Sequence, residues 1–221
     1  MAVLSIALAL LAAAAPAADS GQADVNRAAA LIGAKQPAEA VAVLDALIAR
    51  QEAERKGETR DVYCARTPAE TMLYTGMAAQ AKRRALVLAE AACYPLFLKG
   101  FALIDLNRPD EARPWLERAL AMGPSNAQFL GELAEWYKSQ RQWPKARELF
   151  QRAVDASALS PENRQVFDKT RGLRGLGFIL VEEHRLDEAE KLYREALRLD
   201  PNDERSKRQL QYIAEQRGTT I

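Results

Sequence analysis

The sequence predicts an all-α protein built as an α-solenoid, in which similar helical hairpins stack side by side. Its 221 residues are 48% hydrophobic but only 7% aromatic, which is a helical composition with enough chain for a sizeable core. The stretch EEHRLDEAEKLYREALRLDPND at 182–203 closely resembles LNRPDEARPWLERALAMGPSN at 106–126. Each such hairpin has one apolar face that it cannot bury alone, so only a stacked neighbour completes the core.

A constant spacing of small and large apolar residues defines the repeat. One alanine recurs in the second helix of each unit. In the last three units, a small residue stands twelve places before this alanine. In every unit, a large apolar residue follows the alanine four places later. Small residues are needed where two helices cross at about 8–10 Å. The alanines are Ala40, Ala112, Ala146 and Ala189, the earlier small residues are Gly100, Ala134 and Gly177, and the large residues are Leu44, Leu116, Phe150 and Tyr193.

This pattern resembles the tetratricopeptide repeat, a 34-residue helix–turn–helix unit. The resemblance implies a right-handed α-solenoid with a C-terminal capping helix, in which Leu210 and Ile213 face the last hairpin. The units at 93–126 and 170–203 match best. The predicted divisions are a degenerate N-terminal repeat at 19–56, repeats at 93–126, 127–169 (with an extended connection) and 170–203, and the capping helix with its tail at 204–221.

Residues 57–92 do not fit the repeat pattern. Thr67 is a good N-cap with Glu70 three residues later, so we expect one helix from about 68 to 82. The following ALVLAEAA gives no clear prediction. Two alternatives stay open: an irregular helical insert whose helix crosses the groove, or a degenerate repeat.

The N-terminal residues 1–18 predict a secretory signal peptide. MAVLSIALALLAAAAPAA has no charged side chain and ends in small residues that a signal peptidase requires. Its apolar run is shorter than the roughly 20 residues that span a bilayer. We therefore expect a periplasmic or secreted protein that begins at Ala18 or Asp19 and does not insert into the membrane after cleavage. An uncleaved anchor or a buried first helix is the alternative.

The two cysteines, Cys64 and Cys93, flank most of the irregular segment. In an oxidising compartment an even number of cysteines favours a disulfide. Two separate buried thiols are the alternative. The only histidine, His184, lies in a predicted turn, and there is no Cys-x-x-Cys, so we expect no metal and no cofactor.

Little in the sequence indicates catalysis or nucleic-acid binding. Lys+Arg 31 against Asp+Glu 30 leaves a net charge of +1, which provides no global field to attract nucleic acid. The single histidine gives no support for a nucleophile–base pair. GLRGLG at 172–177 lacks the spacing and the preceding strand of a phosphate loop, and its glycines fall where helices pack. We therefore expect a protein that is not an enzyme, with no catalytic residues.

The resemblance also implies a binding face. Places 2, 5, 9 and 12 of each first helix line the concave side of such solenoids. The unit at 93–126 places an apolar stripe there, which is either an open groove or a core surface covered by residues 57–92. Arg171 and Arg174 are expected to be exposed and to orient a partner. The candidate partner-binding residues are Tyr94, Phe97, Phe101, Ile104, Glu135, Lys138, Arg171, Arg174 and Phe178, beside Gln128, Gly131 and Val181.

Binding is therefore the expected function. The main hypothesis is a periplasmic scaffold or adaptor that holds a segment of a protein partner on its concave face. The alternatives are a structural or self-associating subunit of an envelope complex, including a homodimer, or a periplasmic protein that neutralises a toxin. The sequence does not identify the partner.

Overall fold

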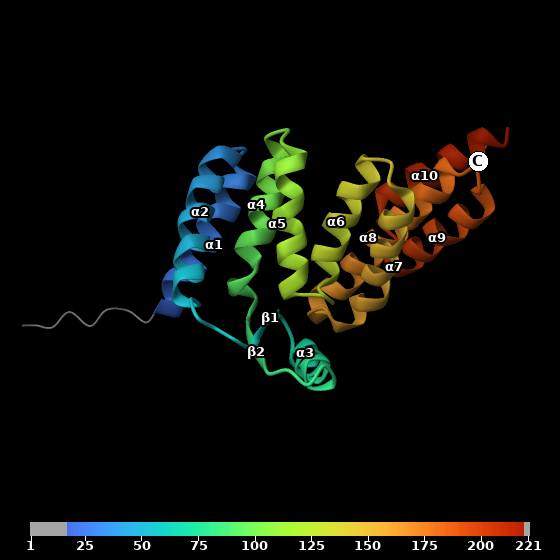
Figure 1. Cartoon of the computed structure of the whole chain (residues 1–221). Coiled ribbons are helices and arrows are strands. Elements are labelled where there is room, and N and C mark those ends of the chain that lie inside the picture. Colours follow the sequence, from blue (N-terminus) through green and yellow to red (C-terminus); the bar gives the residue numbers. More distant parts are fainter. Residues whose placement is uncertain (1–16, 219–221) are drawn as a thin grey trace, which may run out of the picture.

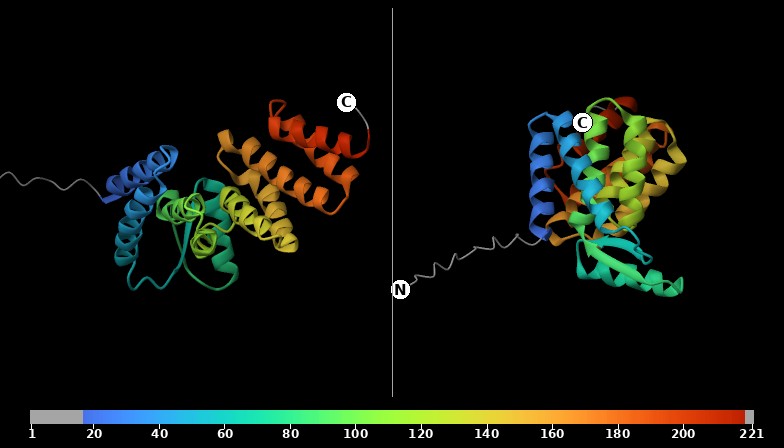
Figure 2. Two further views of the ribbon diagram at one scale, coloured as in Figure 1. Left: turned by 90° about the horizontal axis from the view of Figure 1, so that it is seen from above. Right: turned by 60° about the vertical axis from the view of Figure 1, so that its left-hand side comes forward.

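A computed structural model describes residues 17–218 as a curved row of antiparallel helix pairs (Figure 1). The predicted signal peptide, residues 1–18, lies almost wholly outside the described residues. Seen from above, successive pairs are rotated relative to one another along the row (Figure 2). The predicted all-α solenoid is confirmed. The pairs are α1 (Ala17–Gly33) with α2 (Pro37–Glu54), α4 (Tyr94–Asp105) with α5 (Pro109–Met122), α6 (Ala127–Ser139) with α7 (Trp143–Ala156), and α8 (Glu162–Glu182) with α9 (Leu186–Leu199), followed by α10 (Glu204–Gln216).

Small residues stand where the paired helices cross, as the repeat pattern predicts. A Cβ atom added at Gly100 would lie 2.6 Å from the Leu116 side chain, and one at Gly177 would lie 2.8 Å from the Tyr193 ring. Both partners are 1% exposed. Any larger side chain at these glycines would push the helices of its pair apart.

The turns inside the hairpins share one backbone conformation. Lys35, Asn107, Arg141 and His184 each have a φ between 55° and 61°, and each lies two residues after the end of the first helix of its pair. This left-handed residue ends the helix in the way that a C-terminal cap does. The only histidine is therefore a turn residue, and it lies on the solvent-exposed side of its hairpin.

The capping helix α10 packs as the sequence predicts. Ile213 is 1% exposed, and Leu210 packs beside it against the last hairpin. α8 differs from the simple repeat because it begins at Glu162, about two turns before the predicted start at Thr170. A short 3-10 helix, η2 (Ser157–Leu159), connects it to α7.

Residues 61–92 form a small β–α–β unit, which we call the insert. It consists of β1 (Asp61–Ala65), α3 (Pro68–Gln80), β2 (Ala85–Ala89) and the short helix η1 (Glu90–Ala92). The two strands pair in parallel, with Cys64 opposite Leu88. Parallel strands need a crossover connection, which α3 supplies. The insert lies beyond the ends of the hairpins, with α3 at the edge of the molecule (Figure 1, Figure 2).

The alternative of an insert is confirmed in part, because the expected helix forms as α3, but no strands were expected in residues 57–92. The segment is not a degenerate repeat, and its helix does not cross the groove. Both strands are unpredicted, and β2 has the sequence ALVLA, which is apolar without interruption. Such a short run is compatible with either a strand or a piece of buried helix, and only its pairing with β1 decides between them.

A disulfide and a buried ion-pair network attach the insert to the solenoid. Cys64 of β1 is bonded to Cys93 at the start of α4, with the Cα atoms 6.2 Å apart, so the predicted disulfide is confirmed. On the other side, the Thr67 hydroxyl donates to the Leu159 carbonyl oxygen at 3.0 Å. The predicted N-cap also forms, because the Thr67 hydroxyl oxygen accepts from the Glu70 backbone N–H at 3.2 Å.

Arg66 is the centre of the ion-pair network. Its guanidinium lies 2.8 Å from the Glu70 carboxylate and 3.6 Å from that of Asp168 on α8, and it donates to the Ser160 hydroxyl at 3.2 Å. The three charged side chains are at most 4% exposed. Their charges are paired and hydrogen-bonded, as burial requires. The insert is therefore held to α8 by contacts that are distant in sequence.

Candidate partner-binding groove

The concave side carries three hollows that share lining residues, and together they form one continuous groove. The N-terminal hollow has a volume of about 550 Å³, the central hollow about 270 Å³ and the C-terminal hollow about 590 Å³. Tyr94 and Gln128 line both the N-terminal and central hollows. Phe101 and Arg171 line both the central and C-terminal hollows. The groove therefore runs from α1 to α10.

The apolar stripe on α4 is divided between core and groove. Phe97 is only 4% exposed, and its ring stacks against those of Tyr94 and Phe129 at centroid distances of 5.3 and 5.2 Å. Phe101 is half-buried and faces the groove, while Ile104 packs against the core. Phe97 is therefore a core residue, and Phe101 is the member of the stripe most available to a partner.

The insert does not cover this stripe. Ala29 and Ile32 of α1 line the central hollow beside Phe97, and Phe129 of α6 packs on the other side. Ala65 and Arg66 of the insert line only the N-terminal hollow. The groove therefore stays open between α4 and α10.

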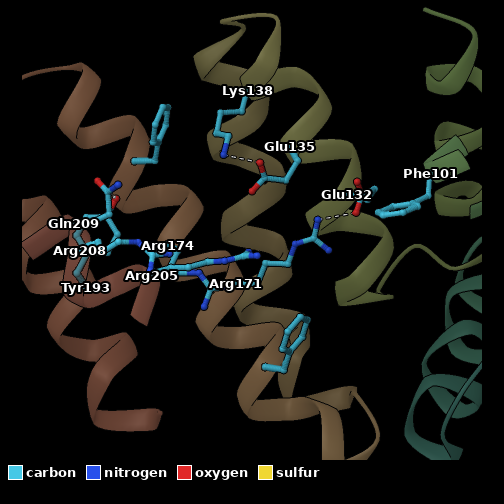
Figure 3. Close-up of a pocket in the computed structure, with 12 residues that line it drawn as sticks. Phe101, Glu132, Glu135, Lys138, Arg171, Arg174, Tyr193, Arg205, Arg208 and Gln209 are labelled. Carbon is cyan, nitrogen blue, oxygen red and sulfur yellow. Dashed lines mark hydrogen bonds and ion pairs between the residues drawn. The ribbon is translucent and has the colours of Figure 1, made fainter. Parts of the chain in front are cut away.

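The C-terminal hollow is rich in arginine (Figure 3). Arg171 forms an ion pair with Glu132 at 2.7 Å, and Arg174 pairs with Asp203 at 3.0 Å. The expectation that both arginines are exposed is wrong, because their side chains are only 19% and 15% exposed. No local sequence pattern indicates their acidic partners, because Glu132 lies on α6 and Asp203 is the N-cap residue of α10. Both arginines nevertheless line the hollow.

Two further arginines, Arg205 and Arg208 of α10, line the same hollow and were missed by the sequence analysis (Figure 3). Both are exposed, and neither belongs to an ion pair within residues 17–218. A repeat counted from Glu204 would have placed them at positions 2 and 5, the places that Arg171 and Arg174 occupy in α8. Treating α10 only as a cap concealed this correspondence.

The α6 wall of the hollow carries an ion pair and a cation–π contact. Lys138 and Glu135 form an ion pair at 2.5 Å on the α6 wall of the hollow (Figure 3). The Lys138 ammonium also lies 4.7 Å from the ring centre of Phe178, which is a cation–π distance. Glu135, Lys138 and Phe178, all predicted from the sequence, therefore meet on one wall.

The N-terminal hollow combines polar and apolar side chains and contains a partly buried carboxyl group. Burial raises the pKa of Glu90, although the nearby Arg66 guanidinium opposes this shift. Burial likewise raises the pKa of Tyr94, whose hydroxyl oxygen accepts from the Gln128 side-chain amide at 3.4 Å. These groups offer hydrogen bonds of both kinds to a bound segment.

The described part of the chain contains no cluster of three or more His, Cys, Asp or Glu side chains that could hold a metal ion. Among residues 17–218, no helix is both long enough and apolar enough to cross a membrane.

Comparison with known proteins assigns the fold. Residues 97–161 and 170–203 match two family models, both described as tetratricopeptide repeat. The comparison with curated proteins found no match. These matches and the helical pairs define an interaction-type α-solenoid with a concave groove. Residues 97–161 and 170–203 of the chain are tetratricopeptide repeats.

Solved structures of low sequence identity share this architecture. PilF of Pseudomonas aeruginosa superposes with a TM-score of 0.60 at 14% identity, covering 91% of this chain and 70% of PilF. A Podospora anserina protein with nearly identical TPR-like repeats gives a TM-score of 0.59 at 16% identity, covering 90% of this chain and 87% of that one. MamA from Desulfovibrio magneticus RS-1 gives 0.57 at 15% identity, covering 90% and 86%. At these identities the likeness concerns the fold alone.

Proposed function

We propose that this protein is an exported, non-enzymatic scaffold that holds an acidic segment of a partner protein in the concave groove. Tetratricopeptide repeats typically serve as protein-interaction modules rather than catalysts. The observation that carries the proposal is the groove itself, which joins an aromatic centre to an arginine-rich end. The partner's acidic residues would lie over α8 and α10, and its apolar residues over α4.

The charges favour this orientation. Arg171 and Arg174 already have acidic partners, whereas Arg205 and Arg208 have none among the described residues. A carboxylate arriving on α10 would therefore meet unsatisfied guanidinium groups that can bind it with two parallel hydrogen bonds. Phe101 supplies apolar contact area nearby.

Export is supported by two independent features. The uncharged apolar run at residues 1–18 ends in small residues, and the described chain contains a disulfide. Disulfides persist in oxidising compartments such as the bacterial periplasm. The intact mass of the native protein tests export: a mature chain starting at Ala18 or Asp19 is expected, and a cytosolic product that retains Met1 would contradict it.

The groove is tested by capture of partners from the envelope fraction of the source cells. The Arg205→Glu/Arg208→Glu variant is compared with a matched Lys191→Glu/Arg198→Glu variant. Lys191 and Arg198 are also exposed cations without an ion pair within residues 17–218, but they lie on α9 outside the groove. We expect the α10 variant to bind the partner up to roughly thirtyfold more weakly, because two exposed cations contribute up to about 1 kcal/mol each.

Two results would contradict the groove proposal. One is equal capture by both variants. The other is a stable dimer in solution whose formation is lost on Phe101→Ser, because the groove would then be occupied by a second copy of the chain. Phe101 is the better probe than Phe97, whose replacement would also damage the core.

A further inference from the structure

α3 presents a solvent-facing surface without any charged side chain. Glu70 is the only charged residue of the helix, and it is fully buried. Met72 is 77% exposed, and Leu73 and Met77 are each 38% exposed. Leu73 and Met77, four residues apart, lie on one face of the helix, and Met72 lies beside Leu73 at the edge of this surface, because successive residues are about 100° apart. Exposed helix faces normally carry charged or polar residues, so this face is unusual.

The position of α3 leaves this face free. Its inner side is anchored by the fully buried Tyr74, whose hydroxyl oxygen accepts from the Ser125 backbone N–H at 3.2 Å. The outer side projects from the edge of the solenoid beyond the hairpin ends (Figure 1, Figure 2). α1 also begins at this edge (Figure 1). No residue of α3 lines any of the three hollows of the groove.

Basic residues follow α3 directly. Lys82, Arg83 and Arg84 are all exposed. Arg83 forms an ion pair with Asp61, whereas Lys82 and Arg84 belong to no ion pair among the described residues. The apolar face is therefore bordered by two cations that are available to an anionic partner.

We propose that α3 and Lys82–Arg84 dock on an anionic lipid surface as a peripheral contact. Met72, Leu73 and Met77 would enter the head-group region, while Lys82 and Arg84 would meet lipid phosphates. This combination of an uncharged apolar helix face with adjacent cations matches such a surface in charge. The inference does not depend on what the groove binds.

A second copy of the chain suits this face less well. A standard protein interface buries roughly 800 Å² on each partner, and three side chains provide much less. A lipid surface needs neither a large area nor a matching shape.

Vesicle flotation tests the proposal with the purified mature protein, using the same N-terminus in every variant. The vesicles contain phosphatidylcholine alone or phosphatidylcholine mixed with phosphatidylglycerol. The variants are Lys82→Asn/Arg84→Gln and Met72→Ser/Met77→Ser. The controls are Lys191→Gln/Arg198→Gln for charge and Tyr212→Ser for an exposed apolar side chain, which is 43% exposed in the wild-type protein. Melting curves verify that each variant is folded.

We expect the wild-type protein to float with the anionic vesicles and both controls to behave like it. Each cation near an anionic surface accounts for about a fivefold change in partitioning, so loss of Lys82 and Arg84 should weaken binding roughly thirtyfold. Loss of the two methionines should weaken it roughly tenfold or more. The proposal is overturned by absence of binding, by equal binding to neutral vesicles, by equal loss in the controls, or by a dimer that the methionine variant abolishes.

Discussion

The repeats and the insert of this protein are stabilised in different ways. In the repeats, each hairpin packs on its sequence neighbours through small residues at helix crossings, such as Gly100 against Leu116. The insert has only two short strands and one helix, and a pair of strands alone is marginally stable. It depends on two attachments to the solenoid, the Cys64–Cys93 disulfide and the buried Arg66 network. The repeats are therefore stabilised by packing on their sequence neighbours, whereas the insert is stabilised by specific bonds to residues distant in sequence.

This difference allows the two regions to be destabilised separately. A solenoid is stabilised by many contacts between neighbouring repeats, so the effect of a single substitution on stability is spread over several repeats. The insert concentrates its stability in a few contacts, and losing one of them should release it locally. Hydrogen exchange resolved by peptide can distinguish the two responses.

The largest expected effect follows from Arg66→Met. The change leaves the Glu70 carboxylate buried without a counter-charge, which typically costs about 3–5 kcal/mol. Glu70 is 0% exposed, so water cannot compensate. Peptides of β1 and β2 should lose protection from hydrogen exchange, while peptides of α6 and α7 keep it.

Arg164→Met is the matched control, because Arg164 also pairs with Asp168, at 3.1 Å, but its side chain is 36% exposed. We expect it to cost about 1 kcal/mol or less. A second variant, Arg66→Met with Glu70→Leu, should recover part of the lost stability by removing the unpaired charge. If Arg66→Met and Arg164→Met were equally stable, the network would not be what holds the insert.

Removal of the disulfide should have the next largest effect. Cys64 and Cys93 are 29 residues apart, and closing a loop of this length contributes roughly 3–4 kcal/mol in the chain-entropy model. Reduction, or Cys64→Ser with Cys93→Ser, should lower the melting temperature. The helical circular dichroism signal should persist, because the packing of residues 127–217 does not involve either cysteine. Free thiols that react with an alkylating reagent in the native exported protein would contradict this prediction.

Sequence reasoning succeeded where structure depends on neighbours along the chain. The spacing of Ala112, Ala146 and Ala189 predicts the solenoid, and Thr67 predicts the start of α3. It failed where residues far apart in sequence meet. The pairing of β2 with β1 and the burial of Arg171 against Glu132 both depend on contacts that no local pattern records.

The candidate site shows the same division. Places 2, 5 and 9 of the first helices correctly indicate which residues face the concave side, including Phe101 and Phe178. They do not show that Phe97 is covered by α1 and α6, because curvature between units decides this. A periodic sequence thus predicts towards which side of the solenoid a side chain points. The exposed fraction of that side chain depends on how successive hairpins are rotated.

Glycine-to-alanine substitutions extend the comparison, because the same substitution should lower stability in the repeats and raise it in the insert. A Cβ atom at Gly175 of α8 would lie 2.4 Å from the Phe150 ring, whereas one at Gly76 of α3 meets nothing within 4 Å. Overpacking costs about 1–3 kcal/mol, and alanine gains about 1 kcal/mol over glycine in a helix. We expect Gly175→Ala to destabilise by about 1–2 kcal/mol and Gly76→Ala to stabilise by up to about 1 kcal/mol, measured by urea unfolding. Equal effects at the two sites would remove the packing role assigned to Gly175.

The smallest expected effect is a pH dependence at the junction of the insert with α4. Burial raises the pKa of Glu90 above its ordinary value, so the folded protein prefers the neutral carboxyl group. Stability from this group should therefore increase as the pH falls toward the raised pKa. We expect Glu90→Gln to stabilise the protein at neutral pH, and the difference from the wild-type protein to shrink toward about pH 4, where the carboxyl group becomes neutral as well.

Glu111 on α5, within the repeats, has a pKa shifted in the opposite direction to that of Glu90. Comparing the Glu111→Gln and Glu90→Gln variants therefore makes the test decisive. Its hydrogen bonds from the Arg108 guanidinium lower the pKa of the Glu111 carboxyl group. The stability that this pair contributes is present at neutral pH and is lost as the pH falls through the lowered pKa. Glu111→Gln should therefore be slightly less stable than the wild-type protein at neutral pH and equal to it in acid. If Glu90→Gln were also less stable at neutral pH, the attraction of Arg66 for Glu90 would outweigh the cost of burial, and Glu90 would belong to the bonds that hold the insert.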